Sequence, residues 1–491
     1  MVLSELLTVL DKKEKLGNCT EDPDIQAIYF DSRRVTNHSL FVAIKGTKSD
    51  GHDFINQAIE KGAKAILIED SFSIKSLDDS VAYFKVENSS IALGLVASKF
   101  YNFPSTKMKV VAVTGTNGKT TVATLLYELF KNLGYNCGLF STVQNKVKDK
   151  TYDAFLTTPD PVFIHSTMAE MVKTGCTHCF MEASSHAIHQ NRLAGLDIDG
   201  AIFTNISHDH LDYHGTFDNY IKAKKKLFDE LKPQAFALAN KDDKRASVML
   251  QNTFAKKYYF SLHSEADFKC KIISNTLQGL ELELNGHKAW FRLVGNFNAY
   301  NLTAVFGAAV LLEENEIDVL RALSEVNPPK GRFHVLTSNK GLNAVIDYAH
   351  TPDALENVLT TLRSCIEKPT TQIITVVGCG GDRDKTKRPL MGKIASQLSD
   401  WVIITSDNPR SEDPEAIANQ MLEGVPISLR KKVLKILDRK EAIKTAIALG
   451  STHDVVLVAG KGHENYQEIQ GIKYPFDDYQ VVNEIFLTKN E

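Results

Sequence analysis

The sequence predicts an α/β protein that contains three domains. Short apolar runs rich in β-branched residues alternate with segments of helical periodicity along most of the chain, which is typical of α/β proteins. The length of 491 residues is sufficient for about three domains. A candidate linker at residues 102–105 and the return of the α/β rhythm after about residue 331 place the domains at 1–105, 106–331 and 332–491.

Composition indicates a globular enzyme of the cytoplasm. The chain is 43% hydrophobic and 24% charged, and its net charge of −3 without a long basic run argues against a nucleic-acid partner. No apolar run reaches the roughly 18–20 residues that a membrane span needs, and the acidic residues among the first 15 do not fit a secretory signal. Seven scattered cysteines favour a reducing compartment, and Cys176 and Cys179 are expected to be buried structural residues rather than a metal site.

The first domain combines short strands with a helix. Strands are expected at residues 27–30, 40–43 and 63–68, with a helix at 54–60. Asp31, Ser32 and Arg33 follow the first strand. This polar trio is either an ordinary turn or part of a binding site.

The second domain begins with a candidate phosphate loop. Residues 110–113 form a buried strand, the loop Gly115-Thr116-Asn117-Gly118-Lys119-Thr120-Thr121 follows, and residues 122–133 have helical periodicity. Backbone N–H groups at the helix start and the Lys119 ammonium can bind phosphate, and the Thr120 hydroxyl can ligate Mg²⁺. The loop is shorter than the usual motif, because Val113 stands where the first glycine is expected. The sequence therefore predicts a central parallel sheet of the P-loop ATPase type that binds ATP.

Polar residues follow two further strands of this domain. Glu182 ends a strand at 179–182, where a carboxylate beside a phosphate loop can hold Mg²⁺ directly or through water. The strand at 201–205 leads into a segment with His208, Asp209, His210, Asp212 and His214. We interpret this segment as a metal or phosphate contact, with a hydrated polar loop as the alternative. The helix at 220–231 carries four lysines, and the pattern alone does not single out one of them.

The end of the second domain changes its period. Residues 280–284 alternate strictly between apolar and polar, and Asn285-Gly286 is a hairpin signal, so an antiparallel excursion is expected. Asn298 and Asn301 lie one turn apart at the start of a helix, where their amides can bind an adenine edge or cap the helix.

The third domain has a Rossmann-like pattern. Strands are expected at residues 344–346, 373–377, 401–405 and 455–458, with helices between them. Each strand ends in a polar loop, and ligands of open α/β sheets bind at the carboxyl ends of the strands. We therefore expect a substrate site in this domain.

The motifs together resemble the Mur ligase family over the whole chain. The shortened phosphate loop is similar to the loop of that family, and further motifs follow in the family's order: Glu182-Ala183-Ser184-Ser185-His186, Asn205 with Asp209-His210-Leu211-Asp212, Gly295 with Asn298 and Asn301, Gly331-Arg332, and Asp347-Tyr348-Ala349-His350. The resemblance implies ATP-driven amide formation in peptidoglycan precursor synthesis, a requirement for Mg²⁺, and a monomeric cytoplasmic protein. The motifs are most similar to the member that extends UDP-N-acetylmuramoyl-L-alanyl-D-glutamate by its third amino acid.

The resemblance also assigns site residues. For ATP it implies Gly115, Thr116, Asn117, Gly118, Lys119, Thr120, Thr121, Asn298, Asn301, Arg332, Asp347 and His350. For the UDP-sugar and its peptide it implies Ser32, Arg33, Thr157, Thr158, Ser184, Gln190 and Arg192. Catalysis is assigned to Lys119, Glu182, His210 and Lys224, and Mg²⁺ to Thr120, Glu182, His210 and a carbamylated Lys224. Carbamylation requires a neutral amine, so the environment of Lys224 must lower its pKa.

The third amino acid is implied by the last domain. Asp407-Asn408-Pro409-Arg410 is similar to the signature of family members that add meso-2,6-diaminopimelate, and the other implied contacts are Arg388, Gly460 and Glu464. Diaminopimelate has a distal carboxylate where lysine has only an ammonium. Arg410 can bind a carboxylate with a bidentate fork but repels a bare ammonium. Lysine should therefore be a very poor substrate.

The implied reaction has two steps and leaves alternatives. The γ-carboxylate of D-glutamate attacks the γ-phosphate of ATP, and the amine of diaminopimelate then attacks the acyl phosphate. Because the implied residues lie on two domains, we expect the third domain to move during the reaction. Alternatives are an L-lysine-adding ligase, a related ligase such as folylpolyglutamate synthetase, and a nucleotide-binding protein without activity.

Overall fold

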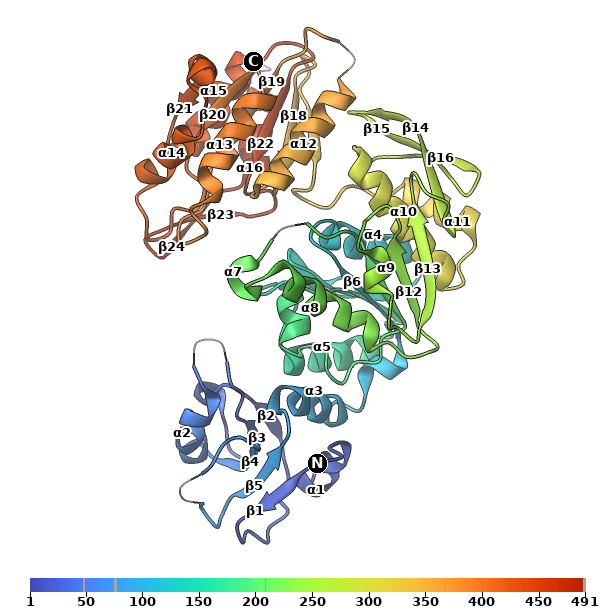
Figure 1. Ribbon diagram of the computed structural model, residues 1–491, viewed down its shortest axis with the longest axis vertical. Helices are drawn as coiled ribbons and strands as arrows, with labels where there is room; N and C mark the ends of the chain where they lie inside the picture. Colours follow the sequence, from blue (N-terminus) through green and yellow to red (C-terminus); the bar gives the residue numbers. More distant parts are fainter. Residues whose placement is uncertain (47–48, 75–76, 208, 367, 489–491) are drawn as a thin grey trace. The chain divides into compact units, whose positions relative to one another are not determined.

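A computed structural model describes residues 1–46, 49–74, 77–207, 209–366 and 368–488. The chain forms two compact units, one made of Met1–Asp267 and Ala304–Val319, the other of Phe268–Thr303 and the chain from Leu320. The first unit contains an N-terminal sheet and the sheet that carries the phosphate loop. The second contains an antiparallel meander and the C-terminal sheet (Figure 1).

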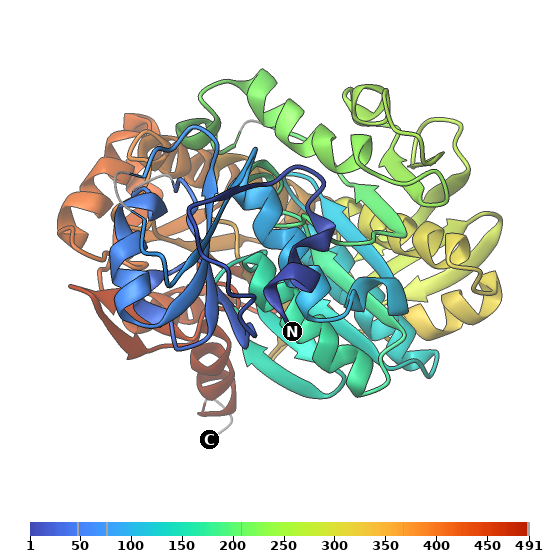
Figure 2. The same cartoon turned by 90° about the horizontal axis from the view of Figure 1, so that it is seen from below.

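The N-terminal sheet has five strands in the order β1-β5-β4-β3-β2, and only β1 is antiparallel to its neighbour. Its strands are β1 (Glu14–Leu16), β2 (Ala27–Tyr29), β3 (Ser39–Val42), β4 (Ala63–Glu69) and β5 (Ala82–Val86), and its helices are α1 (Leu3–Leu6), α2 (Ile55–Glu60) and α3 (Ser89–Phe100). In β4, Ala65 and Leu67 pack in the core that contains α3, whereas Ile66 and Ile68 pack in the core that contains α2. This alternation places the two helices on opposite faces of the sheet, drawn in blue in Figure 2.

The sheet of the phosphate loop has, in this unit, the strand order β13-β12-β11-β6-β10-β7-β8-β9. Neighbouring strands in it are parallel except in the pairs β7-β8 and β8-β9, which are antiparallel. The strands are β6 (Lys109–Thr114), β7 (Cys137–Phe140), β8 (Gln144–Val147), β9 (Lys150–Asp153), β10 (His178–Glu182), β11 (Gly200–Phe203), β12 (Phe236–Asn240) and β13 (Lys256–Ser261). The helices are α4 (Lys119–Asn132), α5 (Pro161–Lys173), α6 (Ser185–His189), α7 (Leu211–His214), α8 (Phe217–Asp229) and α9 (Ala246–Met249).

The central strand β6 and the helix after it confirm the predicted strand–loop–helix. Residues 110–113 are fully buried, as expected for a parallel strand that is covered on both faces. Helix α4 begins at Lys119, three residues earlier than predicted. The reason is Gly118, whose φ of +88° ends the loop and places Lys119 in the first helical turn.

The predicted linker at residues 102–105 is a folded turn. Asn102 and Phe103 have left-handed backbone conformations, and the Oγ of the buried Ser105 accepts a hydrogen bond from Asp197 N at 3.0 Å. Nearby, the backbone of Gly94 in α3 lies so close to Ala194 that a β-carbon would be 2.3 Å from its carbonyl oxygen. The N-terminal sheet is therefore packed against its neighbour within the first unit.

The second unit begins with the antiparallel excursion that the sequence predicts. Strands β14 (Phe268–Thr276), β15 (Gly279–Leu284) and β16 (His287–Phe291) form a meander. The Asn285-Gly286 turn has positive φ at both residues, as a type I′ hairpin requires. Helix α10 (Asn296–Leu311) begins in this unit and ends in the first, where α11 (Glu316–Ser324) also begins.

The C-terminal sheet confirms the Rossmann-like prediction. Its order is β17-β18-β22-β19-β20-β21, parallel except for β17, and a separate hairpin β23-β24 follows. The strands are β17 (His334–Thr337), β18 (Asn343–Asp347), β19 (Ile373–Val377), β20 (Trp401–Ile404), β21 (Val433–Lys435), β22 (Val455–Ala459), β23 (Tyr466–Ile469) and β24 (Ile472–Pro475). The helices are α12 (Pro352–Cys365), α13 (Lys387–Leu398), α14 (Pro414–Glu423), α15 (Arg439–Leu449) and α16 (Asp478–Thr488).

Helices cover both faces of this sheet. In β22, Val455 and Leu457 pack in the core formed with α12, α13 and α14, and Val456 and Val458 pack in the core formed with α15 and α16. Because both faces are buried, the loops at the strand ends are the part of the sheet that can reach a ligand.

All seven cysteines are buried and none forms a disulfide. Cys176 and Cys179 belong to the core of the phosphate-loop sheet, which confirms the structural role expected for them. Burial raises the pKa of Cys270 and of Cys365 to about 11. Over the parts of the chain that the structure describes, no helix is long and apolar enough to cross a membrane.

Candidate active site

The phosphate loop is shaped by residues at the end of β11. Thr116 N donates to Asn205 O at 2.8 Å, and Asn117 N donates to Asn205 Oδ1 at 3.0 Å. The Thr204 hydroxyl donates to Asn117 O at 2.6 Å. A β-carbon on Gly115 would lie 1.9 Å from Thr204 Oγ1, so glycine is required at this position.

Two lysine ammonium groups donate to the same carbonyl of the loop. Lys119 Nζ lies 2.9 Å from Gly115 O, and Lys224 Nζ, which comes from α8, lies 2.7 Å from the same oxygen. The Lys224 side chain is buried, with 1% of the residue exposed. Burial, with a smaller contribution from the Lys119 charge, holds the pKa of Lys224 well below the usual lysine value.

The structure separates Lys224 from the other lysines of its helix. Lys222 is exposed, Lys225 pairs with Asp229 at 2.5 Å, and Lys226 pairs with Asn191. Of the four lysines that the sequence pattern left equivalent, Lys224 is the one that points into the phosphate loop.

Glu182 is fully buried at the end of β10. Its Oε1 accepts from Thr142 N at 2.6 Å and its Oε2 accepts from the Thr142 hydroxyl at 3.1 Å. The same hydroxyl oxygen lies 3.2 Å from Thr157 Oγ1 and can accept its hydrogen, so Thr142 connects the carboxylate to a residue predicted to bind the UDP-sugar substrate.

Four other residues predicted to bind that substrate form a continuous network with this strand. The buried Thr158 donates through Oγ1 to Glu182 O at 2.7 Å and accepts from Ser184 N at 3.1 Å. Arg192 Nη1 donates to Thr158 O at 2.8 Å, and its Nε and Nη2 donate to Gln190 Oε1 at 3.0 and 2.6 Å. The guanidinium is therefore held in one orientation at the strand end.

His210 precedes α7 in a left-handed conformation, with φ of +54°. Its Nε2 lies 3.4 Å from Asp209 Oδ2, and its ring centroid lies 6.3 Å from that of Tyr220. Lys224 Nζ lies 4.6 Å from the centroid of the same Tyr220 ring. The structure thus places His210 and Lys224 around one aromatic side chain, while His208 of the predicted cluster lies outside the described residues.

The first-domain candidates Ser32 and Arg33 follow β2. The Asp31 carboxylate accepts from Arg33 N at 3.0 Å and pairs with the largely exposed Arg33 guanidinium at 2.8 Å. This pairing lowers the pKa of Asp31. The buried Ser32 hydroxyl donates to Gln57 Oε1 at 2.6 Å. The trio is therefore a capped turn that presents one arginine side chain to solvent.

In the second unit, the predicted adenine residues lie at the start of α10. Asn298 Nδ2 donates to Val294 O at 2.8 Å, and Asn301 Nδ2 donates to Asn298 Oδ1 at 2.9 Å. Both side chains are buried. The Asn298 side chain donates to a carbonyl that precedes the helix and so does not act as an N-cap, which would accept from a backbone N–H, and the amide pair fixes the orientation of both groups.

Arg332, Asp347 and His350 gather around Tyr348 at the end of β18. The Arg332 guanidinium carbon lies 4.9 Å from the Tyr348 ring centroid, and His350 Nδ1 lies 2.8 Å from Tyr348 O. Asp347 Oδ2 accepts from Phe333 N at 2.7 Å. Burial raises the pKa of Asp347 to about 6, although the Arg332 charge opposes that shift.

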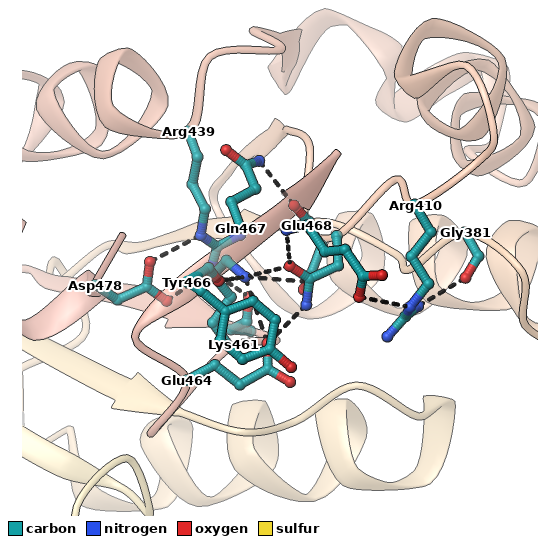
Figure 3. A network of polar contacts seen from close by, with 12 residues as sticks. Gly381, Arg410, Arg439, Lys461, Glu464, Tyr466, Gln467, Glu468 and Asp478 are labelled. Atoms are coloured by element: carbon teal, nitrogen blue, oxygen red, sulfur yellow. Dashed lines mark hydrogen bonds and ion pairs between the residues drawn. The ribbon is translucent and has the colours of Figure 1, made fainter. Parts of the chain in front are cut away.

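Arg410 is held between the loop after β19 and strand β23 of the separate hairpin (Figure 3). Its Nη1 donates to Gly381 O at 2.7 Å, and its Nε lies 3.5 Å from Glu468 Oε2 on β23. Its backbone has a φ of +51°, and its N–H donates to Glu468 O at 3.0 Å. The loop after β20 is thereby fixed to the β23-β24 hairpin.

The other residues predicted to bind the amino acid surround this loop. Asn408 Nδ2 donates to Glu464 Oε2 at 2.8 Å. Gly460 has a φ of +116°, and a β-carbon there would lie 2.5 Å from Asp407 Oδ2. Burial, and to a smaller extent the Asp407 charge, raises the pKa of Glu464. The structure therefore brings together residues from the loops after β20 and β22.

Arg388 has a more structural environment than the prediction implies. Its side chain is fully buried, and its Nη1 and Nη2 lie 3.0 and 2.9 Å from the two Glu412 carboxylate oxygens. Nη2 also lies 3.3 Å from Gly380 O, next to the carbonyl that Arg410 contacts. The Arg388 hydrogen bond holds the pKa of Glu412 at about 2. Arg388 therefore fixes the glycine loop on which Arg410 rests.

Sequence reasoning did not single out three residues that organise these sites. Thr142 donates a hydrogen bond to Glu182, and Lys461 donates one to Asn408 in the loop after β20. The Tyr213 hydroxyl accepts from Gln190 Nε2 at 2.9 Å and lies 3.0 Å from His189 Nδ1. Only Lys461 carried a local signal, because it stands in a glycine-flanked loop after a predicted strand.

Comparisons with known proteins identify the family to which the chain is similar. Residues 24–101 match the "Mur ligase family, catalytic domain", residues 113–309 the "Mur ligase middle domain", and residues 331–462 the "Mur ligase, glutamate ligase domain". The chain is 56% identical over 467 residues to the UDP-N-acetylmuramoyl-L-alanyl-D-glutamate--2,6-diaminopimelate ligase of Cytophaga hutchinsonii, covering 95% of this chain and 96% of that protein. It is 51% identical to the ligase of the same name from Parabacteroides distasonis, with both chains covered completely.

A solved structure gives the same result. A UDP-N-acetylmuramoyl-L-alanyl-D-glutamate--2,6-diaminopimelate ligase structure matches with a TM-score of 0.72 and 32% identity over 100% of both chains. The matched families account for most of the chain, in the order in which the motifs occur. The phosphate loop, the three matched regions and the full-length relatives together show one thing: the chain belongs to the Mur ligase family.

Proposed function

We propose that this protein is an ATP-dependent ligase that adds meso-2,6-diaminopimelate to UDP-N-acetylmuramoyl-L-alanyl-D-glutamate during cytoplasmic peptidoglycan precursor synthesis. Membership in the Mur ligase family supports ATP-driven amide formation. The similarity of the full chain to diaminopimelate ligases supports the choice of substrates.

The single observation that carries the choice of amino acid is the placement of Arg410. Its guanidinium is anchored to Gly381 O at 2.7 Å, and its Nε lies 3.5 Å from Glu468 Oε2. An arginine held in this way can bind the distal carboxylate of diaminopimelate with two parallel hydrogen bonds. L-Lysine lacks that carboxylate and would leave a desolvated guanidinium opposite an alkyl ammonium, which can exclude it by roughly 10⁴–10⁵.

The first chemical step forms an acyl phosphate. The γ-carboxylate of the D-glutamate residue attacks the γ-phosphorus of ATP, the bond to the bridging oxygen breaks, and ADP leaves. In our proposal Thr157, Thr158 and Arg192 hold the UDP-linked substrate, and the Lys119 ammonium neutralises charge on the transferred phosphoryl group. The rigid network from Thr158 to Arg192 supports this role, because pre-organised donors lose little freedom when substrate binds.

The second step forms the amide. The neutral amine of diaminopimelate attacks the carbonyl carbon of the acyl phosphate, and phosphate leaves from the tetrahedral intermediate. In our proposal Arg410 and Glu464 hold the distal carboxylate and ammonium of the amino acid. The remaining amine is then the nucleophile that attacks the activated carbonyl.

The residues assigned to Mg²⁺ fit a hard cation. Glu182 uses two of about four acceptor positions for Thr142 and keeps capacity for a ligand. Burial of Lys224 lowers its pKa and so favours the loss of the proton that must leave before the amine can react with CO₂, and the resulting carbamate would offer oxygen ligands. Thr120 and His210 complete the proposed set. When bound, Mg²⁺ supplies positive charge at the phosphate groups.

The test is phosphate release with ATP, Mg²⁺ and UDP-N-acetylmuramoyl-L-alanyl-D-glutamate, offering meso-diaminopimelate or L-lysine in parallel. We expect release with diaminopimelate and very little with lysine. Arg410→Ala should abolish most of this preference, whereas Arg430→Ala, at an exposed arginine of the same domain, should leave it unchanged. Equal release with both amino acids by the unmodified protein would keep the ligase assignment but reject the role of Arg410. No release with either acceptor would reject the proposed function.

A further inference from the structure

A buried ammonium group lies between the loop after β20, which contains Asp407 and Asn408, and the loop after β22, which contains Glu464. Lys461 has no exposed surface, and Figure 3 shows its side chain among the loops after β20 and β22 and strand β23. Its Nζ donates to Asn408 Oδ1 at 2.9 Å, to Tyr466 O at 2.7 Å and to Glu464 Oε2 at 3.4 Å. These three acceptors match the three N–H bonds of an ammonium group.

The Lys461 ammonium determines which way the Asn408 amide faces. A lysine ammonium can only donate, so the atom of Asn408 that faces it must be the oxygen. The same Oδ1 accepts from Glu468 N at 2.9 Å. The amide nitrogen is then directed to Glu464 Oε2, at 2.8 Å. Lys461 thereby fixes Asn408 and, through it, the Glu464 carboxylate.

Lys461 also sets the charge of the pocket. It lies 3.7 Å from Asp407 Oδ1 in addition to its contact with Glu464. Two carboxylates and one ammonium leave a net charge of about −1, because the nearby Arg439 is already paired with Asp478. A pocket of this charge attracts an ammonium group of the incoming amino acid, while the repulsion between its two carboxylates is reduced.

Backbone contacts connect this cluster to the arginine that we assign to the distal carboxylate. Lys461 Nζ holds the carbonyl of Tyr466 in β23, and two residues further along that strand Glu468 pairs with Arg410. Gln467 Nε2, between them, donates to Asp407 O at 2.7 Å. The ammonium-binding and carboxylate-binding ends of the pocket are therefore parts of one hydrogen-bonded structure.

We propose that Lys461 is a positioning residue that sets the affinity of the enzyme for its amino-acid acceptor by fixing Asn408 and Glu464. This inference rests on the proposed function, because it assumes that the pocket binds an amino acid with a distal ammonium and carboxylate. Lys461 does not contact the reacting atoms. Its role is to orient the groups that do contact the acceptor.

The test replaces Lys461 by methionine, which has a similar length but no charge, and by glutamine, which is uncharged but keeps an NH₂ group with two N–H donors. The matched control is Lys473→Met, an exposed lysine of β24 whose Nζ lies 4.2 Å from the centroid of the same Tyr466 ring. For each protein, KM is measured separately for diaminopimelate, ATP and the UDP-linked substrate by phosphate release. Thermal unfolding is recorded in parallel.

We expect Lys461→Met to raise KM for diaminopimelate about 10- to 100-fold, the range for loss of a buried charge-assisted hydrogen bond. Lys461→Gln should give a smaller rise, and Lys473→Met should give none. KM for ATP and for the UDP-linked substrate should stay within about threefold, because their proposed residues do not contact Lys461.

Three results would reject the inference. In the first, Lys461→Met keeps the diaminopimelate KM of the unmodified protein. In the second, the KM values for all three substrates rise together. In the third, both Lys461 variants fail to fold, which would show that the residue has a purely structural role. Failure of the proposed function is distinguishable, because it appears in the unmodified protein as absence of diaminopimelate-dependent release and overturns both proposals together.

Discussion

The buried Arg439–Asp478 pair should be among the strongest single contributions to the stability of the C-terminal sheet. Both side chains are fully buried, and Arg439 Nε and Nη2 lie 2.8 and 2.7 Å from the two carboxylate oxygens of Asp478. Nη2 also donates to Ala459 O at 3.0 Å, at the end of β22. The pair therefore connects the starts of α15 and α16 to the central strand (Figure 3).

The magnitude follows from the burial of the two charges. Asp478→Asn or Arg439→Met leaves one charge without its partner in a site that water does not reach, which costs about 3–5 kcal/mol. Arg439→Met also removes the bond to Ala459 O, worth about 1 kcal/mol. The double variant Arg439→Met, Asp478→Leu leaves no buried charge and removes the buried Nη1, which has no hydrogen-bond partner. It should therefore lie within about 2 kcal/mol of the unmodified protein, giving a coupling energy of at least about 5 kcal/mol.

The measurement is amide hydrogen exchange of β22 in the full chain, because a chain of two units need not unfold in one step. The matched control is Lys440→Met, which removes an exposed ion pair with Glu484 between the same two helices, at 3.4 Å. That pair should contribute less than about 1 kcal/mol. Single variants at Arg439 or Asp478 that change the opening free energy of β22 by less than about 1 kcal/mol would refute the reasoning, as would additive effects in the double variant.

Two further predictions concern charge at Lys224 and at Glu412. Lys224→Met should lower kcat about 10²–10³-fold, because it removes a group that acts on the transferred phosphoryl. When the unmodified enzyme is assayed in CO₂-depleted buffer, added bicarbonate should restore its activity. Lys225→Met is the control, and full activity of Lys224→Met would contradict the carbamate assignment. Because the pKa of Glu412 is about 2 in the folded chain against 4.5 ordinarily, the Arg388–Glu412 pair should stabilise the C-terminal sheet fully above pH 4.5 and lose that contribution as the pH falls toward 2. Denaturant titrations at several pH values should show this dependence of the free energy of unfolding on pH, and Glu412→Gln should reduce it. An equal pH dependence in Glu412→Gln and in the unmodified protein would count against the pairing.

Periodicity was sufficient for most strands and helices, because parallel strands buried on both faces are continuous apolar runs. Residues 110–113 and 455–458 are examples, and both strands lie where they were predicted. The hairpin at Asn285-Gly286 was predictable because a type I′ turn needs positive φ at both residues. Boundaries were less predictable: the start of α4 depends on Gly118, which a periodicity argument does not weigh.

The candidate sites were predictable only where a motif is continuous in sequence. The phosphate loop is such a motif, whereas the choice of Lys224 among four lysines depends on which helical face meets Gly115, 109 residues earlier. Thr142 and Tyr213 act through hydrogen bonds to residues distant in sequence, and nothing in their neighbourhoods distinguishes them. Arg388 shows the opposite case, because its motif was visible but its pairing with Glu412 was not.

The seven buried thiols make this chain convenient for site-specific labelling. Thiol reagents attack the thiolate, and burial raises the pKa of Cys365 to about 11 and that of Cys379 to about 12, so these groups stay protonated near neutral pH. No cysteine is accessible at the surface. An engineered cysteine at an exposed position of each unit would therefore take up a dye without prior removal of the natural thiols. Energy transfer between two such dyes would report the separation of the two units during each turnover.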